Sequence, residues 1–289
     1  MGGGGAAAAR RGGPRRTAVI RAPSLSPRVL LDELSKLAHH RDLLYTLTLH
    51  RVKVRYKQSA LGVAWAVLQP LSLMGIYTLI FSYIAKVESE GAPYAVFAYA
   101  ALLPWTYFST AVVNATNGLV SHSQLVTKVY FPREILPLTY VFAALLDFAV
   151  ASCVFAGLLA YYRAPVTAAA LYAVPIILVL TVFASAVSFL LSATQVRFRD
   201  IGVAMPLLLQ LWMFATPVVY PLGAVPERLR PLLALNPMTG IIENFRRVTL
   251  HGEPPDLRLL VVSAATSLVL LAVSYVYFKR VEATIADVI

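Results

Sequence analysis

The chain carries little charge and a single cysteine for its 289 residues. Only 13% of the residues are charged and 58% are apolar, and the mean hydropathy is +0.70. Soluble globular proteins carry about 25% charged residues, so this composition excludes a soluble fold and predicts a membrane protein with several spans. The lone Cys153 lies in an apolar run and cannot form an intrachain disulfide, so it leaves the redox compartment open.

Motifs for nucleotide, metal and acid–base chemistry are also missing. No G-x-x-x-x-G-K-[ST] loop occurs, so this chain cannot hold ATP through a P-loop. There are no paired carboxylates of the kind that hold Mg²⁺ with a pyrophosphate, and the five histidines lack the i, i+4 spacing of a helical metal site. We therefore expect no catalytic residues, no metal site and no cofactor on this chain.

Positive charge is present, but it is concentrated before the first long apolar run. Residues 1–57 hold twelve Lys and Arg against three acids, which accounts for nine of the eleven net positive charges. Cations beside a span favour anionic lipid headgroups or an anionic lipid-linked substrate over nucleic acid. They also tend to stay in the cytoplasm, so the N-terminus is predicted inside.

The N-terminal part divides into two segments. Residues 1–27 are rich in Gly, Ala, Arg and Pro and lack the apolar core of a secretory signal, so they predict a disordered basic tail. Residues 28–58 predict a cytoplasmic interface helix, because their leucines share one helical face. The alternation of Val52, Val54 and Tyr56 with cations has strand period, but a lone strand would have no partner here. The leucines on the helical face are Leu30, Leu31, Leu34 and Leu37.

The rest of the chain, 59–289, predicts one transmembrane domain. A helix needs about 20 apolar residues to cross the hydrocarbon core. Six runs meet this length: 63–85, 95–119, 136–160, 170–193, 202–220 and 257–278. The segment 221–256 is apolar enough for two short re-entrant helices before the last span. The expected fold is thus an all-α integral membrane protein with six transmembrane helices, an amphipathic interface helix and both termini in the cytoplasm.

Two groups of charged residues are candidates for function. Asp147 is the one acid near the middle of an apolar run, and it is either a cation-coupling site or a polar anchor bonded to a neighbouring helix. Arg51, Lys53, Arg55 and Lys57 directly precede the first run. Arg51 and Arg55 share a helical face, and a guanidinium group can engage two phosphate oxygens at once. The alternative is that these cations only set the topology and bind bulk anionic lipid.

The segment 121–137 between the second and third runs combines basic and aromatic residues. Pro132 and Pro137 bracket Arg133 and Glu134 and confine any helix here to a short piece along the membrane face. Such a piece suits docking to a partner. The residues expected in that contact are Lys128, Tyr130, Phe131, Pro132, Arg133 and Glu134.

Aromatic residues are abundant in the first two runs and their connection. Interfacial belts and packing are the general explanation for such residues. The alternative is a channel lining, because sugar C–H faces stack on aromatic rings without a fixed hydrogen-bond pattern and a polymer could slide along it. The candidates for this lining are Trp65, Tyr77, Tyr83, Tyr99, Trp105, Tyr107 and Phe108.

Three segments together resemble one family. The sequences LGVAWAVLQPL (61–71), YFPREILP (130–137) and QVRFRDI (195–201) are similar to the permease subunit of ABC type-2 polysaccharide exporters, over about residues 40–280. Members move lipid-linked O-antigen, teichoic acid, capsule or related glycans. The resemblance implies a homodimer in the cytoplasmic (inner) membrane with two copies of a separate ATP-binding subunit, which holds ATP and Mg. It assigns the docking helix to about 121–134, the interface helix to about 36–57 and an inner-loop motif to Arg197, Phe198, Arg199 and Asp200.

The expected function is therefore that of a transport subunit and not of an enzyme. It would move a lipid-linked polysaccharide across the cytoplasmic membrane, with the ATP-binding subunit, a second copy of itself, the lipid-linked glycan and membrane lipids as partners. One alternative is an ABC-2 exporter of a small lipophilic compound. A membrane lipid-phosphate or glycosyl transferase is less well supported, because it needs an acid cluster that the sequence lacks.

Overall fold

The structure is a computed structural model that describes residues 39–57, 59, 61–87, 89, 91–124 and 131–288, with side chains up to Glu282. The predicted tail 1–27, the first part of the interface-helix region (28–38), Lys128 and Tyr130 lie outside the described residues. Within the described residues the regular structure is helical, with no strand. The expected all-α fold is therefore confirmed for this part of the chain.

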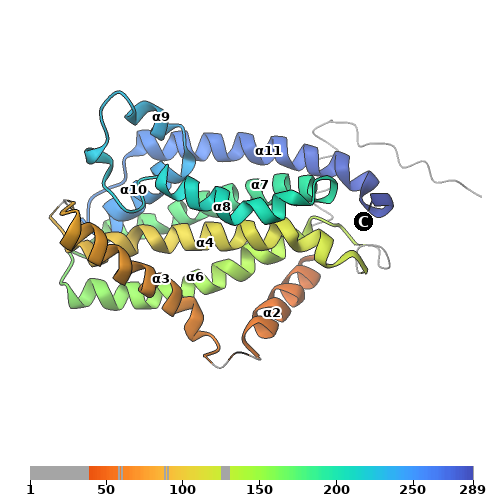
Figure 1. Ribbon diagram of the computed structural model, residues 1–289, viewed down its shortest axis with the longest axis horizontal. Helices are drawn as coiled ribbons and strands as arrows, with labels where there is room; N and C mark the ends of the chain where they lie inside the picture. Colours follow the sequence, from red (N-terminus) through yellow and green to blue (C-terminus); the bar gives the residue numbers. More distant parts are fainter. Residues whose placement is uncertain are drawn as a thin grey trace, which may run out of the picture.

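Long helices run side by side along the bundle (Figure 1). In chain order the elements are α2 (Arg41–Lys57), α3 (Ala64–Tyr77) with its π-helical continuation η1 (Thr78–Ile84), α4 (Tyr94–Ser121), α6 (Ile135–Tyr161), η2 (Ala168–Tyr172), α7 (Ala173–Arg197), α8 (Asp200–Phe214), η3 (Leu222–Ala224), α9 (Arg230–Ala234), α10 (Pro237–Thr249) and α11 (Leu257–Val288).

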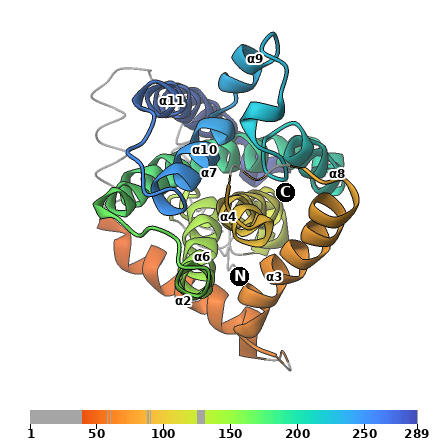
Figure 2. The same cartoon turned by 90° about the vertical axis from the view of Figure 1, so that its left-hand side faces the viewer.

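Helix α4 is the centre of the bundle (Figure 2). It packs against α6 and α7, and α7 in turn packs against α11. Small residues on α4, such as Ala111 and Ala115, are fully buried and let the neighbouring helices approach closely. At Gly118 the approach is closest, because an added Cβ would lie 2.5 Å from the ring of Tyr140 on α6. Most of α4 is therefore closed off from its surroundings.

Five helices in the described part of the chain are long and apolar enough to cross a membrane, which supports a multi-pass membrane protein. They are Ala64–Ile84, Tyr94–Ser121, Ile135–Tyr161, Ala168–Arg197 and Leu257–Glu282. These segments match five of the six predicted runs. The remaining predicted run, 202–220, forms a helix that is shorter than a span requires.

The predicted span 202–220 ends early, at Phe214. Helix α8 has 15 residues, which is about 22 Å of helix against a hydrocarbon core of about 30 Å. Pro217 has no backbone N–H to continue the helix. The carbonyl of Pro217 also accepts a hydrogen bond of 2.8 Å from Arg246, whose buried side chain donates to Val218 as well. The length of the apolar run did not reveal that its residues 215–220 are not helical.

Two short helices, α9 and α10, occupy the segment where re-entrant helices were expected. The amide of Asn236 caps α10 by accepting from the N–H of Met238 at 3.2 Å, and Pro237 follows at the first helical position. Helix α10 packs against α4, α7 and α11. That the two helices dip into the outer leaflet stays a prediction.

One end of the bundle collects basic residues and is called the basic end below. At this end α4 and α7 finish, α6 and α8 begin, and α11 has its C-terminus (Figure 1). Arg133, Arg197, Arg199, Lys279 and Arg280 all belong to this end. The opposite end carries the connections between α3 and α4 and between α6 and α7, together with α9.

Candidate functional site

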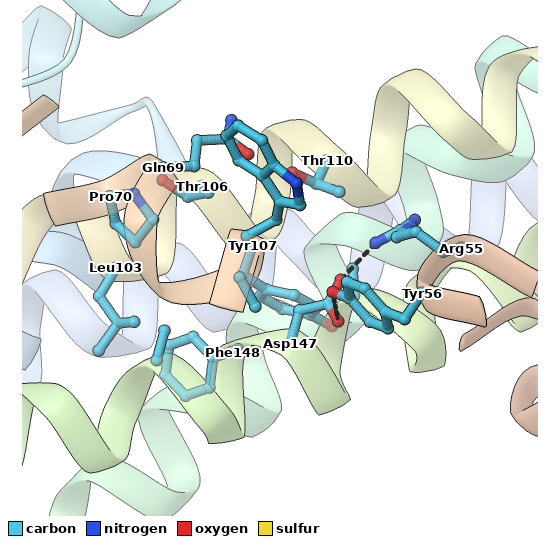
Figure 3. A pocket seen from close by; sticks show the side chains of 14 residues that line it. Arg55, Tyr56, Gln69, Pro70, Leu103, Thr106, Tyr107, Thr110, Asp147 and Phe148 are labelled. Carbon is cyan, nitrogen blue, oxygen red and sulfur yellow. Dashed lines mark hydrogen bonds and ion pairs between the residues drawn. The ribbon is translucent and has the colours of Figure 1, made fainter. Parts of the chain in front are cut away.

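Helix α2 is bonded through its last turn to the middle of α6. The hydroxyl of Tyr56 donates to Oδ1 of Asp147 at 2.6 Å, and Nη1 of Arg55 donates to Oδ2 of the same carboxylate (Figure 3). The side chains of Arg55 and Asp147 are 34% and 18% exposed. One helix therefore supplies two donors to a single acid on another helix.

The position of Arg55 along the bundle differs from the predicted one. Asp147 lies about 18 Å along α6 from its start, which is more than half of a hydrocarbon core of about 30 Å. The sequence placed Arg55 at the level of the lipid headgroups, but the contact places it beside the middle of a long apolar helix. At such a depth charged side chains pair with one another, and Asp147 is the partner of Arg55.

These bonds are those of a polar anchor, one of the two expected roles of Asp147. The residues that the structure describes contain no group of three or more His, Cys, Asp or Glu that could hold a metal ion. The cation-coupling role stays a prediction. Residues 51–56 are helical, as predicted, despite the strand period of their side chains, and α2 packs against α6.

Arg51 lies closer to the basic end than Arg55. Its guanidinium carbon lies 4.8 Å from the centre of the Tyr140 ring, and Nη2 donates to Nε2 of His122. Nδ1 of His122 lies 2.9 Å from the backbone oxygen of Gly118, which assigns the ring proton to Nδ1. Burial and the cation of Arg51 lower the pKa of His122, so its ring is neutral at neutral pH. The side chains of Lys53 and Lys57 are exposed.

Two adjacent cavities border this region. The first, the Asp147 cavity, has a volume of about 170 Å³ and lies between α2, α3, α4 and α6. The second, the α3–α8 groove, has a volume of about 430 Å³ and lies between α3, α4 and α8. Gln69, Thr106 and Thr110 line both, so the cavities adjoin along α4.

The α3–α8 groove is rich in uncharged polar groups. Amide groups come from α3, α4 and α8, and hydroxyl groups come from α4. These groups belong to Gln69, Thr106, Ser109, Thr110, Asn114 and Gln210. Sequence reasoning missed them, since a hydroxyl or amide in an apolar run carries no signal of the direction in which it points.

The proposed channel aromatics fall into two sets. Tyr99 and Phe108 are fully buried and stack on Phe155 and Phe183 with ring centres 5.9 Å and 5.1 Å apart. They belong to the packed core of the subunit and cannot line a channel in this arrangement, because α4 is covered on most sides. The sequence could not distinguish such residues from a lining.

The other five aromatics border a cavity or the surface, although Trp105 and Tyr107 are also buried, at 5% and 2% exposed. Trp65 and Tyr107 border the Asp147 cavity, and Tyr77 and Trp105 border the α3–α8 groove. Tyr83, in η1, is exposed. The structure thus brings four of these rings to the same two cavities that contain the polar groups.

A second charge network lies at the basic end. Glu134 is fully buried, and Oε2 of its carboxylate lies 2.9 Å from Nζ of Lys279, which also lies 3.0 Å from Glu282. Burial raises the pKa of Glu134 and Glu282 raises it further, while Lys279 opposes both. The backbone N–H of Arg133 donates to Glu282 at 3.2 Å. The end of the expected docking segment is therefore fastened to α11.

The sequence had indicated Arg133 and Glu134 but missed Lys279 and Glu282. The i, i+3 spacing of that pair was the available signal. Phe131 is buried and Pro132 is partly buried in the same region.

The RFRD motif forms a fixed corner between α7 and α8. Oε1 of Gln195 accepts from the N–H of Gly202 at 2.6 Å, and Nε2 donates to the carbonyl of Arg199 at 3.1 Å and to Asn117 at 3.3 Å. An added Cβ on Gly202 would lie 2.3 Å from Oδ1 of Asn117, so a larger residue would displace the side-chain ends that form the corner. The corner presents its exposed residues at the basic end: Arg197, Phe198, Arg199 and Asp200.

Comparison with known proteins places these features in a family. The profile of the family described as ABC-2 type transporter matches residues 42–250. The chain is 36% identical over 251 residues to the O-antigen export system permease protein RfbA of Myxococcus xanthus, an alignment that covers 86% of this chain and 95% of the relative. It is 27% identical over 249 residues to the protein of the same name from Klebsiella pneumoniae, again with 86% and 95% coverage.

Proposed function

This chain belongs to the ABC-2 type transporter family, and on that premise we propose that it is the permease subunit of an ATP-driven exporter of a lipid-linked polysaccharide, of the O-antigen kind, across the cytoplasmic membrane. Its relatives from Myxococcus xanthus and Klebsiella pneumoniae are named for O-antigen export, and this chain covers 95% of their length. ATP hydrolysis would take place on a separate ATP-binding subunit.

The α3–α8 groove is the observation that carries the glycan assignment. Its amide and hydroxyl groups can bond sugar hydroxyls, and the partly exposed ring of Tyr77 offers a face for stacking. Weak, repeated contacts of this kind let a cargo bind well enough to enter and still move on. A small lipophilic compound would instead favour a mostly apolar lining. The groove also has apolar lining residues such as Leu73, Val113 and Leu209, so the preference for a glycan rests on its amide and hydroxyl side chains.

A second copy of the chain would complete the path. Helices α3 and α8 flank the groove, and both expose large apolar side chains such as Trp65 and Leu207. Two subunits that face each other across these helices would enclose two grooves between them. This arrangement supports the homodimer that the family resemblance implies.

The basic end is the proposed cytoplasmic side. It collects the basic residues that stay inside in most membrane proteins. The docking segment 121–134 begins at this end, and so the two ATP-binding subunits would sit beneath it. Arg51, Lys53, Arg55 and Lys57 would then receive the pyrophosphate of a polyprenyl-linked glycan arriving from that side.

Reconstituted vesicles test the function directly. The chain and its ATP-binding subunit are placed in vesicles with a lipid-linked glycan, and the glycan that becomes accessible to an external glycosidase is measured with and without ATP. We expect ATP-dependent movement in the wild type and a strong reduction in Gln210→Leu, which removes an amide from the groove. Thr194→Val, which removes a side-chain hydroxyl from α7 outside the groove, is the control. Absence of movement in the wild type would refute the assignment.

A further inference from the structure

The Arg55–Tyr56–Asp147 cluster lines one wall of the Asp147 cavity, and this cavity adjoins the α3–α8 groove. Arg55, Tyr56 and Asp147 line the cavity, and the residues shared with the groove are on its other walls (Figure 3). A group that moves from α2 through this cavity into the groove would pass the cluster. No other acid of the described residues lines either cavity.

The size of the Asp147 cavity limits what it can hold. Its volume of about 170 Å³ is many times the roughly 10–15 Å³ that one water requires in this measure. It is smaller than the sites of about 300–1,000 Å³ that enclose drug-sized ligands. A phosphate-sized polar group fits this space, whereas a stretch of glycan does not.

The donors in the cluster suit a phosphate as well as they suit a carboxylate. Arg55 offers a cationic guanidinium group and Tyr56 offers a hydroxyl, and oxygens of either anion accept such bonds. Burial, and then the bond to Asp147, raise the pKa of Tyr56 to about 12, so its hydroxyl keeps the proton that it donates.

Building on the proposed function, we propose that Asp147 is an internal competitor for the phosphate of the lipid-linked substrate. The phosphate takes the place of the carboxylate at Arg55 and Tyr56, and α2 is thereby released from the middle of α6. When the phosphate moves on into the groove, Asp147 closes on the same two donors again.

A competitor at this position solves two physical problems. Asp147 balances the charge of Arg55 while the site holds no substrate, through a pair that water can reach and that is therefore easily exchanged. A fully available Arg would also hold a phosphate too firmly, whereas a transport site must release what it binds. Arg51 is different, because its described partners are a neutral histidine and a tyrosine ring, and it is therefore suited to the first contact.

Binding of a short polyprenyl pyrophosphate tests the competition. The purified full-length subunit in lipid nanodiscs is titrated with farnesyl pyrophosphate. We expect Asp147→Asn to bind this probe about fivefold more tightly than the wild type, the ratio that matches the upper value of about 1 kcal/mol for accessible ion pairs. Asp147→Glu retains the competitor and stays within about twofold of the wild type. Asp42→Asn removes an exposed acid from the first turn of α2 and controls for net charge.

Weaker or unchanged probe binding in Asp147→Asn would overturn the competition, since a pure anchor gains nothing from losing its charge. Arg55→Lys supplies an independent arm: it keeps the charge and loses the planar fork, so probe binding should fall. Equal binding in Arg55→Lys would also overturn the proposal, and it remains measurable if Asp147→Asn fails to fold. Inorganic pyrophosphate should displace the probe, and failure to do so would show that only the isoprenoid tail is bound.

The vesicle assay separates this inference from the proposed function. Export by the wild type together with no gain of probe affinity in Asp147→Asn would refute the competition alone. A gain of affinity without any glycan export by the wild type would refute the proposed cargo and leave the phosphate site in place.

Discussion

Two ion pairs connect α6 to neighbouring helices, and they differ in how far they are exposed. Near the start of α6, Glu134 and Lys279 have side chains that are 0% and 9% exposed. Near the middle, Arg55 and Asp147 are 34% and 18% exposed and border a cavity. A closed pair cannot change partners without local unfolding, whereas an accessible pair can. Helix α11 is thus a fixed neighbour of α6, and α2 is a neighbour that can be exchanged.

The same contrast separates the two sides of the bundle. On the closed side, α4, α7, α10 and α11 pack together, and the corner at Gln195 fixes the start of α8. On the open side, α3 and α8 have little cover within the subunit, and they flank the polar groove. A transporter needs both, because one side must hold its shape while the other admits a partner and a cargo.

The largest effect is expected on the closed side, from Lys279→Met. This change leaves the carboxylate of Glu134 buried without its cation, and breaking one partner of a buried pair costs about 3–5 kcal/mol. The thermal unfolding of the purified subunit in nanodiscs measures the loss. The double variant Glu134→Leu with Lys279→Met should regain most of it, because replacing both partners by apolar groups is often neutral or stabilising. A double variant as unstable as the single one would show that packing and not charge is lost.

The loss of stability in Lys279→Met should also depend on pH. Burial raises the pKa of Glu134 above its ordinary value of 4.5, so the folded state holds this proton to a higher pH than the unfolded state does. Stability therefore falls as the pH rises from the ordinary to the raised pKa, and the removal of Lys279, which opposes the shift, extends that window upward. The difference in unfolding temperature between wild type and variant should grow with pH. Parallel curves would place the cause outside Glu134.

A smaller effect is expected from Gly202→Ala at the corner between α7 and α8. The added Cβ would lie 2.3 Å from Oδ1 of Asn117 and 2.6 Å from Nε2 of Gln195. Overpacking of this kind costs about 1–3 kcal/mol. Gly157→Ala in α6 is the matched control, since no atom lies within 4 Å of its added Cβ, and helix propensity predicts a gain of about 0.5–1 kcal/mol. Equal responses would mean that the corner is as open as the α6 surface.

Much of the fold could be predicted from the apolar runs, because a membrane span is specified by its length and hydropathy. The sequence also singled out Asp147, because a lone acid in an apolar run must have a reason to be there. The length of the apolar run failed at α8, which ends shortly before Pro217, where the carbonyls of Pro217 and Val218 bond Arg246 of α10. A contact of that kind has no local signal.

The partners of the two ion pairs show the same limit. Arg55 and Asp147 were both indicated as functional, but as parts of separate sites, and only the packing of α2 on α6 joins them. Glu134 was assigned to the docking segment, while its cation lies near the end of the last helix. Charge and spacing identify candidates in one helix, whereas pairing across helices is decided by which faces pack together.

The smallest effect on stability is expected from Asp147→Asn, on the open side. Asparagine keeps an oxygen for the hydroxyl of Tyr56, which donates at 2.6 Å in the wild type, and removes only the charge. Arg55 is 34% exposed, so water can solvate its guanidinium group, and accessible pairs contribute about 0.2–1 kcal/mol. The unfolding temperature of Asp147→Asn should therefore lie close to that of Asp42→Asn and well above that of Lys279→Met. A loss as large as that of Lys279→Met would show that the pair at Asp147 is as closed as the pair at Glu134, and α2 would then be a fixed part of the bundle.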